Sequence, residues 1–290
     1  MSLMSVDDLA VRQGDPDLHV VDVRWVLGEP GRGRAAYDAG HLPGAIHLDL
    51  DADFADLAAG SGRHPLPRPA DFTTQLGVAG IGIASVVAIY DDVGGWVAAR
   101  LWWMLDNLGH PRVSVLDGGI AAWEAAGLPL TTDVPVWPAT RLDLPRTEWS
   151  GIVDRDELRA TLGRVVVLDA RAEPRYRGEI EPIDPLAGHI PTALNRPVAE
   201  NLTSDGKFRG PVDLAAGFAA LGALGALGAG SEAERRVVTS CGSGVSACHH
   251  ALAMRVAGLP DPILYVGSWS DWSTAGYPVA TGPDPGSPPD

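Results

Sequence analysis

The residue with the clearest chemical potential in this sequence is a cysteine between a short apolar segment and a glycine-rich turn. Residues 237–247 read Val-Val-Thr-Ser-Cys-Gly-Ser-Gly-Val-Ser-Ala, which predicts a strand that ends near Cys241 and a helix from about residue 245. Backbone N–H groups and the positive end of the helix dipole favour an anion in such a loop, so they stabilise a thiolate or a persulfide. The expected catalytic residue is Cys241, in an active-site loop that continues through Gly242, Ser243, Gly244, Val245, Ser246 and Ala247.

Two other interpretations of this cysteine are less consistent with the residues around it. A cysteine at a strand end is often only a buried apolar group, but Gly242 and Gly244 let the backbone curl around the sulfur. Cysteine phosphatases need an arginine six positions after the cysteine, and that position here is Ala247. The second cysteine, Cys248, is expected to pack in the core, because the pair has neither metal-site nor disulfide-framework spacing.

The chain also contains an internal repeat that spans its length. The Asp-x-Arg segment at residues 20–24 recurs at 167–171, and Gly-His-Leu-Pro at 40–43 recurs as Gly-His-Ile-Pro at 188–191. The copies keep a nearly constant separation, which indicates two duplicated domains rather than a solenoid. Only the second copy has a cysteine loop, since residues 90–95 of the first read Tyr-Asp-Asp-Val-Gly-Gly.

Each copy alternates short apolar runs with helical segments. The expected strands and helices of the central part are residues 86–90, 96–108 and 113–116 in the first copy and 236–240, 245–256 and 263–266 in the second. This pattern predicts an α/β fold of two tandem domains, each a mainly parallel sheet flanked by helices on both faces. Ligands of such sheets bind beyond the carboxyl ends of the strands.

The domain boundaries follow from composition. Residues 1–130 are expected to form the inactive domain, and the proline-rich residues 131–150 a linker. Residues 151–280 are expected to form the catalytic domain, and the proline-rich residues 281–290 a disordered tail. The segment 214–230, rich in Ala, Leu and Gly, is expected to be a packed helix and turn.

Composition excludes several classes of protein. The 290 residues include 22 Lys plus Arg against 37 Asp plus Glu, a net charge of −15, which argues against binding to nucleic acid or an anionic membrane. The first residues lack the basic and apolar segments of a secretory signal, and no apolar run is long enough to span a membrane. We therefore expect a cytoplasmic protein that captures any anionic substrate locally.

At this point the sequence resembles the tandem-domain rhodanese family, which includes thiosulfate and 3-mercaptopyruvate sulfurtransferases. The resemblance covers nearly the whole chain and rests on the duplicated motifs, on Asp117-Gly118-Gly119 with Trp123, and above all on the cysteine loop. It implies an inactive first copy and an active second copy. It also implies a cycle in which Cys241 takes sulfane sulfur from a donor and passes it to an acceptor, with no metal or organic cofactor.

The resemblance gives conflicting indications about the donor. The loop with Ser243 is similar to the mercaptopyruvate type, because thiosulfate enzymes tend to carry basic residues after the cysteine. The resemblance to the family also implies that Arg175 binds the donor anion. Mercaptopyruvate enzymes have a second arginine in a Glu-Pro-Arg segment, but here Ile183 follows Glu-Pro. Thiosulfate and 3-mercaptopyruvate both remain open.

Two further residues are weaker candidates for substrate binding. Arg171 belongs to the duplicated Asp-x-Arg motif, which the inactive copy keeps, so a structural ion pair is the more ordinary role. His41 is a candidate to assist Ser243 in proton transfer, but His189 repeats it, and a hydrogen bond that pins the loop explains both. Trp269 is expected near the rim of the site.

A function of another class fits the same loop. The protein is alternatively a persulfide carrier that receives sulfur from a protein partner and does not turn over small donors. The intact loop and Arg175 favour an enzyme, whereas the missing second arginine favours a carrier. For an enzyme, the expected partners are a small anionic sulfur donor and a thiol acceptor such as thioredoxin.

Overall fold

The computed structural model describes residues 2–221 and 236–289 and divides into two compact units. The first unit contains Met1–Asp56, Leu66–Ser150 and Leu202–Phe208; the second contains Leu57–Pro65, Gly151–Asn201 and Arg209–Asp290. Each unit holds its own five-stranded sheet, in which all strands run parallel. This confirms the expected pair of α/β domains.

The sheet of the first unit has the strand order β1-β5-β4-β2-β3. Its strands are β1 (Leu3–Met4), β2 (Leu18–Asp22), β3 (Ala45–His47), β4 (Val86–Tyr90) and β5 (Val113–Leu116). Every residue of the three inner strands, β5, β4 and β2, is buried. Because successive side chains of a strand point to opposite faces, helices must cover both faces of this sheet.

Six helices surround this sheet. They are α1 (Val6–Val11), α2 (Arg32–Ala39), α3 (Leu50–Asp53), α4 (Pro69–Val78), α5 (Ala98–Asn107) and α6 (Gly119–Ala125). Leu9, Tyr37 and Trp123, from α1, α2 and α6, share one core cluster with alternate residues of β2 and β4. Helix α5, expected from the sequence over 96–108, contacts β4 and β5, and its first eight residues are buried.

The second unit repeats this topology with the strand order β6-β10-β9-β7-β8. Its strands are β6 (Ile152–Val153), β7 (Val166–Asp169), β8 (Ala193–Asn195), β9 (Val237–Ser240) and β10 (Ile263–Tyr265). The equivalence extends to the register, because Asp169 pairs with Ser240 as Asp22 pairs with Tyr90. The duplication in the sequence is therefore a duplication of the fold.

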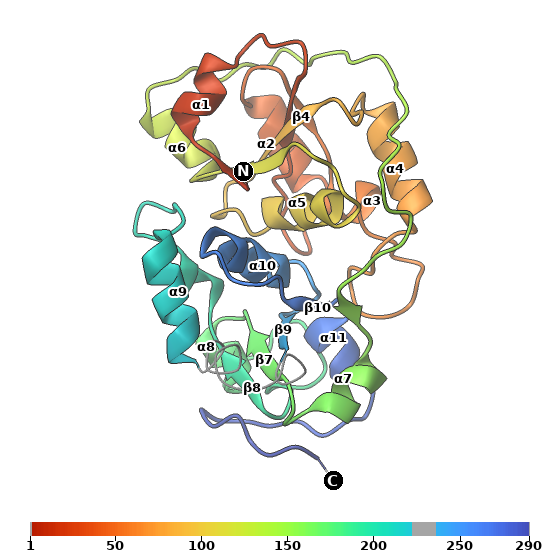
Figure 1. The fold of residues 1–290 in the computed structure, drawn as a ribbon, viewed down its shortest axis with the longest axis vertical. Helices are drawn as coiled ribbons and strands as arrows, with labels where there is room; N and C mark the ends of the chain where they lie inside the picture. The colour runs from red at the N-terminus through yellow and green to blue at the C-terminus, as the bar shows by residue number, and fades with distance from the viewer. Residues whose placement is uncertain (1, 222–235, 290) are drawn as a thin grey trace. The chain divides into compact units, whose positions relative to one another are not determined.

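The second sheet is flanked by helices in the same way, and Figure 1 shows their arrangement. They are α7 (Arg155–Thr161), α8 (Glu173–Tyr176), the 3₁₀ helix η1 (Val198–Asn201), α9 (Pro211–Ala220), α10 (Ala247–Val256) and α11 (Ser268–Trp272). Residues of α7, α8 and α11 form one core cluster with Val167, Val238 and Tyr265, while α10 contacts β9 and β10. The helix expected over 214–230 is described as α9; its remainder from residue 222 lies outside the described residues.

The structure draws the boundaries of the units differently from the sequence-based expectation. Residues 131–150, expected as a linker, belong to the first unit, where Trp149 packs against Phe72 and Trp103. The tail is also tied down, since Gly282 N–H donates to Arg177 O at 2.8 Å. Contacts between aromatic rings and backbone hydrogen bonds hold these proline-rich segments, and composition alone reveals neither.

The third difference is the segment Leu57–Pro65, which lies in the first half of the sequence but belongs to the second unit.

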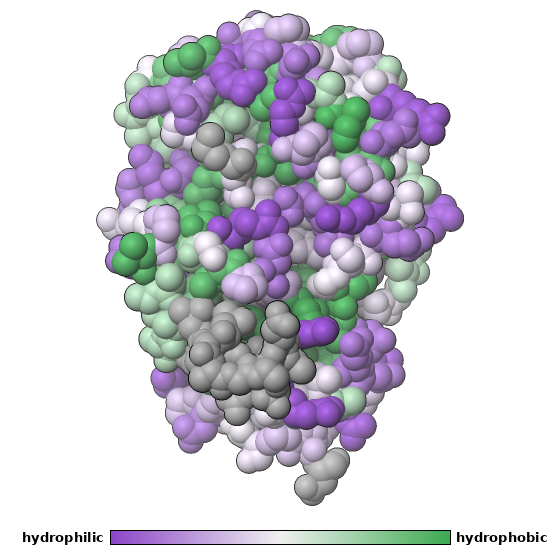
Figure 2. Space-filling model, viewed as in Figure 1, coloured by the Kyte–Doolittle hydropathy of each residue, from purple (hydrophilic) through white to green (hydrophobic). Residues whose placement is uncertain are grey.

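On the face shown in Figure 2, hydrophilic residues alternate with small hydrophobic patches. Within the described residues, no helix has both the length and the apolar character needed to cross a membrane.

Candidate active site

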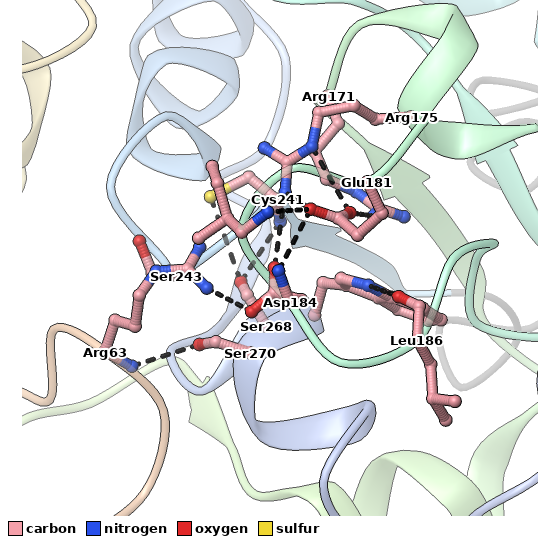
Figure 3. A network of polar contacts seen from close by, with 12 residues as sticks. Arg63, Arg171, Arg175, Glu181, Asp184, Leu186, Cys241, Ser243, Ser268 and Ser270 are labelled. Carbon is pink, nitrogen blue, oxygen red and sulfur yellow. Dashed lines mark hydrogen bonds and ion pairs between the residues drawn. The ribbon is translucent and has the colours of Figure 1, made fainter. Parts of the chain in front are cut away.

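Cys241 follows the last residue of β9, at the carboxyl edge of the second sheet, and only 1% of it is exposed. Its backbone is held on both sides by the segment that begins α11. Cys241 N–H donates to Ser268 Oγ at 3.0 Å, and its carbonyl accepts from Trp269 N–H at 3.0 Å. Gly242 O accepts from Ser270 N–H at 2.9 Å. The loop is therefore fixed by hydrogen bonds before any ligand arrives (Figure 3).

The sulfur itself accepts a hydrogen bond from the backbone. Gly244 N–H donates to Cys241 Sγ at 3.1 Å, and α10 begins shortly after, at Ala247. Gly244 has a φ of +77°, and a β-carbon there would lie 2.3 Å from Val266 O, so only glycine fits. The loop thus places a hydrogen-bond donor directly at the sulfur.

The hydroxyl of Ser243 forms a hydrogen-bonded pair with a histidine. His64 Nδ1 lies 2.7 Å from Ser243 Oγ, and both residues are buried. His64 belongs to the segment Leu57–Pro65 of the second unit. Sequence reasoning missed this residue, although one signal was available: His41 is matched by His189 in the repeat, whereas the Gly-Arg-His-Pro segment around His64 has no second copy.

His41, a weak candidate from the sequence as a partner of Ser243, pins a loop in the structure. Its Nδ1 lies 2.8 Å from Tyr37 O and its Nε2 lies 3.1 Å from Asp133 O, within the first unit. The ring stacks on Tyr37 with centroids 3.7 Å apart. His189 repeats the contact with Tyr176 O at 2.8 Å. Both histidines pin a loop, which is the role that the repeat in the sequence favoured for them, and the histidine that contacts Ser243 is His64.

Arg171 is part of a buried ion pair that both domains contain. Its Nη2 lies 2.7 Å from Asp169 Oδ2, just as Arg24 pairs with Asp22 at 2.6 Å in the first unit. Its guanidinium carbon also lies 4.6 Å from the centre of the Trp269 ring. Burial lowers the pKa of Arg171, but the negative charges of Asp169, Glu181 and Cys241 outweigh burial and raise it. Arg171 thus orders the floor of the site and stays charged.

Arg175 and Arg63 lie on either side of one carboxylate near the cysteine loop. Arg175 Nη2 is 2.7 Å from Glu181 Oε1 and 3.2 Å from Asp184 Oδ2. Arg63 Nη1 forms an ion pair with Asp184 Oδ1. A β-carbon added to Gly242 would lie 3.0 Å from Arg63 Nη2 and 3.6 Å from Arg175 Nη1. The absence of a side chain at Gly242 therefore leaves room for two guanidinium groups beside Cys241 (Figure 3).

The segment that departs from the mercaptopyruvate pattern supplies a carboxylate here. Ile183 is 40% exposed, while the side chain of the next residue, Asp184, is only 4% exposed and points to the two arginines. Burial raises the pKa of Asp184 above its usual range, against the lowering effect of Arg63.

In the first unit, the place of the cysteine is taken by Asp91. Its two carboxylate oxygens accept hydrogen bonds of 2.8–3.0 Å from four backbone N–H groups, those of Val93, Gly95, Val97 and Ala98. Burial raises the pKa of Asp91, whereas these N–H groups lower it. The built-in carboxylate fills the anion site of the first copy, which explains why this copy lacks an open anion-binding loop.

The remaining candidate groups have structural roles. Cys248 is fully buried in α10, and its thiol donates to Gly244 O at 3.4 Å. Trp269 is buried rather than at a rim, and its Nε1–H donates to Leu186 O at 3.0 Å. Across residues 2–221 and 236–289, no group of three or more His, Cys, Asp or Glu side chains is placed to hold a metal ion.

Comparison with known proteins agrees with this geometry. The model of the rhodanese-like domain matches residues 5–126 and again residues 154–275. The chain is 45% identical to a probable 3-mercaptopyruvate sulfurtransferase of Pseudomonas aeruginosa, over 97% of this chain and 98% of that protein. It is 39% identical to a putative thiosulfate sulfurtransferase of Mycobacterium tuberculosis, over 94% of each.

A solved structure shows the same architecture. The 3-mercaptopyruvate sulfurtransferase of Leishmania major superposes with a TM-score of 0.81 and 30% identity, over 96% of this chain and 75% of that one. Each matched range contains four of the five strands of one sheet, and the second range contains the cysteine loop described above. The chain therefore belongs to the rhodanese family, as a sulfurtransferase built from two rhodanese-like domains.

Proposed function

We propose that Cys241 takes sulfane sulfur from a small anionic donor, holds it as a persulfide and transfers it to a thiophilic acceptor. The observation that carries this proposal is the hydrogen bond of 3.1 Å from Gly244 N–H to Cys241 Sγ in the turn just before α10. This arrangement stabilises the thiolate that attacks and the persulfide anion that results. The donor and the acceptor bind in turn, in a ping-pong cycle.

The first half of the cycle is a displacement at sulfur. With thiosulfate, the Cys241 thiolate forms the new S–S bond, the old S–S bond breaks with its electron pair, and sulfite leaves. With 3-mercaptopyruvate, the C–S bond breaks, the electron pair goes to the enolate of pyruvate, and the thiol proton must move to carbon. Ser243 and His64, joined at 2.7 Å, are suited to relay that proton.

The second half regenerates the thiolate. An acceptor nucleophile attacks the outer sulfur of the persulfide and carries it away, as thiocyanate when the acceptor is cyanide. We propose a protein or small-molecule thiol such as thioredoxin as the acceptor in the cell. Nothing in this scheme requires a metal or an organic cofactor.

Two donors have support from different observations. The relatives include proteins named for 3-mercaptopyruvate and for thiosulfate. Arg175 and Arg63 next to Gly242 offer cationic partners for either anion. We therefore propose that the donor is thiosulfate or 3-mercaptopyruvate. The two differ in charge, so the net charge of the residues around Cys241 affects which of them binds better.

Sulfur transfer to cyanide tests the proposal. Thiocyanate formation is measured with each donor separately, for the natural protein, for Cys241→Ser and for Cys248→Ser as the matched control. We expect turnover that Cys241→Ser abolishes and Cys248→Ser retains, and intact-mass analysis that shows one added sulfur after donor treatment. If no small donor supports turnover but a persulfidated protein partner still loads Cys241, the chain is a sulfur carrier instead.

A further inference from the structure

We propose that Arg63 and Arg175 together bind the carboxylate of a singly charged donor, and that Asp184, which holds both, selects against doubly charged donors. This inference deepens the proposed function and rests on it. It assigns to Arg63 the role of the second donor-binding arginine, and it favours a mercapto-carboxylic acid such as 3-mercaptopyruvate over thiosulfate.

The first argument is the convergence of two guanidinium groups on the residue after the nucleophile. Arg63 Nη2 and Arg175 Nη1 lie 3.0 and 3.6 Å from the position of a β-carbon at Gly242. Arg63 is held there by its backbone, because its N–H donates to Ser270 Oγ at 3.0 Å. Ser270 in turn binds Gly242 O through its own N–H. The segment that carries Arg63 is thus attached directly to the cysteine loop.

The second argument is accessibility. The side chains of Arg63 and Arg175 are 24% and 18% exposed, whereas those of Arg171, Glu181 and Asp184 are 2–4% exposed. A dissolved anion therefore meets Arg63 and Arg175 first. Two partly exposed guanidinium groups suit bidentate binding of one carboxylate.

The third argument is charge. The ion pairs form one chain of alternating sign that runs, by successive contacts, through Asp169, Arg171, Glu181, Arg175, Asp184 and Arg63. Three cations balance three carboxylates, so the Cys241 thiolate leaves this group of residues with a net negative charge. A donor with one negative charge meets less repulsion there than thiosulfate, which carries two. Without the negative charge of Asp184, these residues and the thiolate would carry no net charge, so Asp184 is the group that disfavours a dianion.

Steady-state kinetics of three variants test the assignment. Arg63→Gln should raise KM for 3-mercaptopyruvate about tenfold or more, because a charge-assisted hydrogen bond is lost, while kcat changes little. Arg63→Lys should recover part of the loss. The matched control is Arg68→Gln, since Arg68 is an 80% exposed arginine that pairs with Asp71 outside this network. It should leave KM unchanged.

The Asp184→Asn variant tests the selectivity. Removing this carboxylate should raise kcat/KM for thiosulfate relative to 3-mercaptopyruvate by about tenfold, because the site gains one unit of positive charge. An equal effect on both donors would overturn the role of Asp184. Unchanged KM values in Arg63→Gln would overturn the role of Arg63, and that variant serves alone if Asp184→Asn does not fold.

A binding measurement separates failure of this inference from failure of the proposed function. Pyruvate, which has the carboxylate but no sulfur to transfer, should slow the reaction of Cys241 with neutral iodoacetamide. Protection by pyruvate should exceed protection by sulfate, and Arg63→Gln should weaken it even if no donor is turned over. If Arg63→Gln leaves the protection by pyruvate intact while the natural protein turns over donors, only the inference fails.

Discussion

The hydroxyl of Ser243 and the ring of His64 form a pair next to Cys241, and the contribution of this pair to catalysis should depend on the donor. The two atoms lie 2.7 Å apart and are buried. Release of pyruvate from 3-mercaptopyruvate requires a proton on carbon, whereas release of sulfite from thiosulfate requires none. The pair is therefore expected to matter for one donor and not for the other.

Substitution of either residue tests this dependence. We expect Ser243→Ala and His64→Gln to lower kcat with 3-mercaptopyruvate by about 10²-fold, the usual contribution of a positioned acid or base. With thiosulfate they should change kcat only a few-fold. Thiocyanate assays with both donors measure the ratio, and an equal loss with both would mean that the pair only shapes the loop.

Another residue at the site, Ser268, has an unusual backbone conformation. Ser268 has a φ of 51°, and its Oγ accepts from Cys241 N–H at 3.0 Å and donates to Tyr265 O at 2.8 Å. The equivalent residue of the first copy is Gly119, with a φ of 57°. The serine tolerates a conformation that glycine adopts easily, in exchange for a hydrogen bond that fixes the cysteine backbone.

The stabilities of two variants separate these effects. Ser268→Ala keeps the strained backbone and leaves the buried N–H of Cys241 without this partner, so we expect a loss of about 1–3 kcal/mol in the free energy of unfolding. Ser268→Gly loses the same hydrogen bond but relieves the strain, so it should be about 1 kcal/mol more stable than Ser268→Ala. Urea unfolding of both variants gives the order, and the reverse order would exclude strain at this position.

At the scale of elements, α10 carries a buried histidine whose neutral form is fixed by its neighbours. His250 Nε2 lies 2.8 Å from Arg196 O and its Nδ1 lies 3.0 Å from Asn201 Nδ2. Asn201 Oδ1 accepts from Arg196 Nε–H, so the amide nitrogen faces the ring and donates to Nδ1. Burial, with His249 and Arg196 nearby, lowers the pKa of His250 to about 3.

This pKa predicts how stability changes with pH. The unfolded chain takes up a proton on this histidine near pH 6.5, but the folded protein does so only near pH 3. The free energy of unfolding that this group contributes is therefore fully present above pH 6.5. It should fall by about 1.4 kcal/mol per pH unit below that value until about pH 3.

Denaturant unfolding between pH 7 and pH 4 measures this slope. In His250→Gln, the free energy of unfolding should fall less steeply with decreasing pH, by the amount that one proton contributes. This holds even if the variant is less stable at pH 7. A slope that is the same in both proteins would mean that His250 already carries a proton in the folded state. The matched comparison is His47→Gln, which replaces a partly buried histidine of β3 in the first unit.

The two loops that precede α5 and α10 show how one element serves opposite purposes. In the first unit, Asp91 occupies four backbone N–H groups with its own carboxylate. In the second unit, the N–H of Gly244 is aimed at Cys241 Sγ. The same strand, turn and helix thus gives a closed structural loop in one copy and a reactive one in the other.

At the scale of the whole molecule, the segment Leu57–Pro65 belongs to the second unit although the chain reaches it from the first half. It carries Arg63 and His64, and it is attached at Ser270 and Ser243. Gly62 fits there only as glycine, because it has a φ of +78° and its β-carbon would lie 2.8 Å from Gly267 O. The active site is therefore assembled from both halves of the sequence.

Replacement of residues 57–65 by a Gly/Ser segment of equal length tests this organisation. We expect turnover with 3-mercaptopyruvate to fall by at least about 10²-fold, because both the proton relay and one guanidinium are lost. Circular dichroism should show that both sheets persist, since the segment contains no strand or helix. Retained turnover would mean that the site is complete within residues 151–290.

The sequence determined the architecture because the relevant signals are local. Apolar runs and glycine turns located the strands and helices, and the paired Asp-x-Arg motifs revealed the duplication. The cysteine loop was recognisable because one short segment supplies the strand end, the sulfur, the N–H groups and the helix start. Ion pairs between residues two positions apart, such as Asp169 with Arg171, also follow from local sequence.

The tertiary structure decided which distant groups meet at Cys241. His64 instead of His41 contacts Ser243, Arg63 joins Arg175, and Asp184 holds both arginines. The contacts of Arg63 and His64 cannot be read from the spacing of residues, because they join segments more than a hundred positions apart, whereas Arg175 and Asp184 are only nine positions apart. The chemistry of the nucleophile thus follows from one short segment of the sequence, whereas recognition of the donor depends on long-range packing that only the folded chain creates.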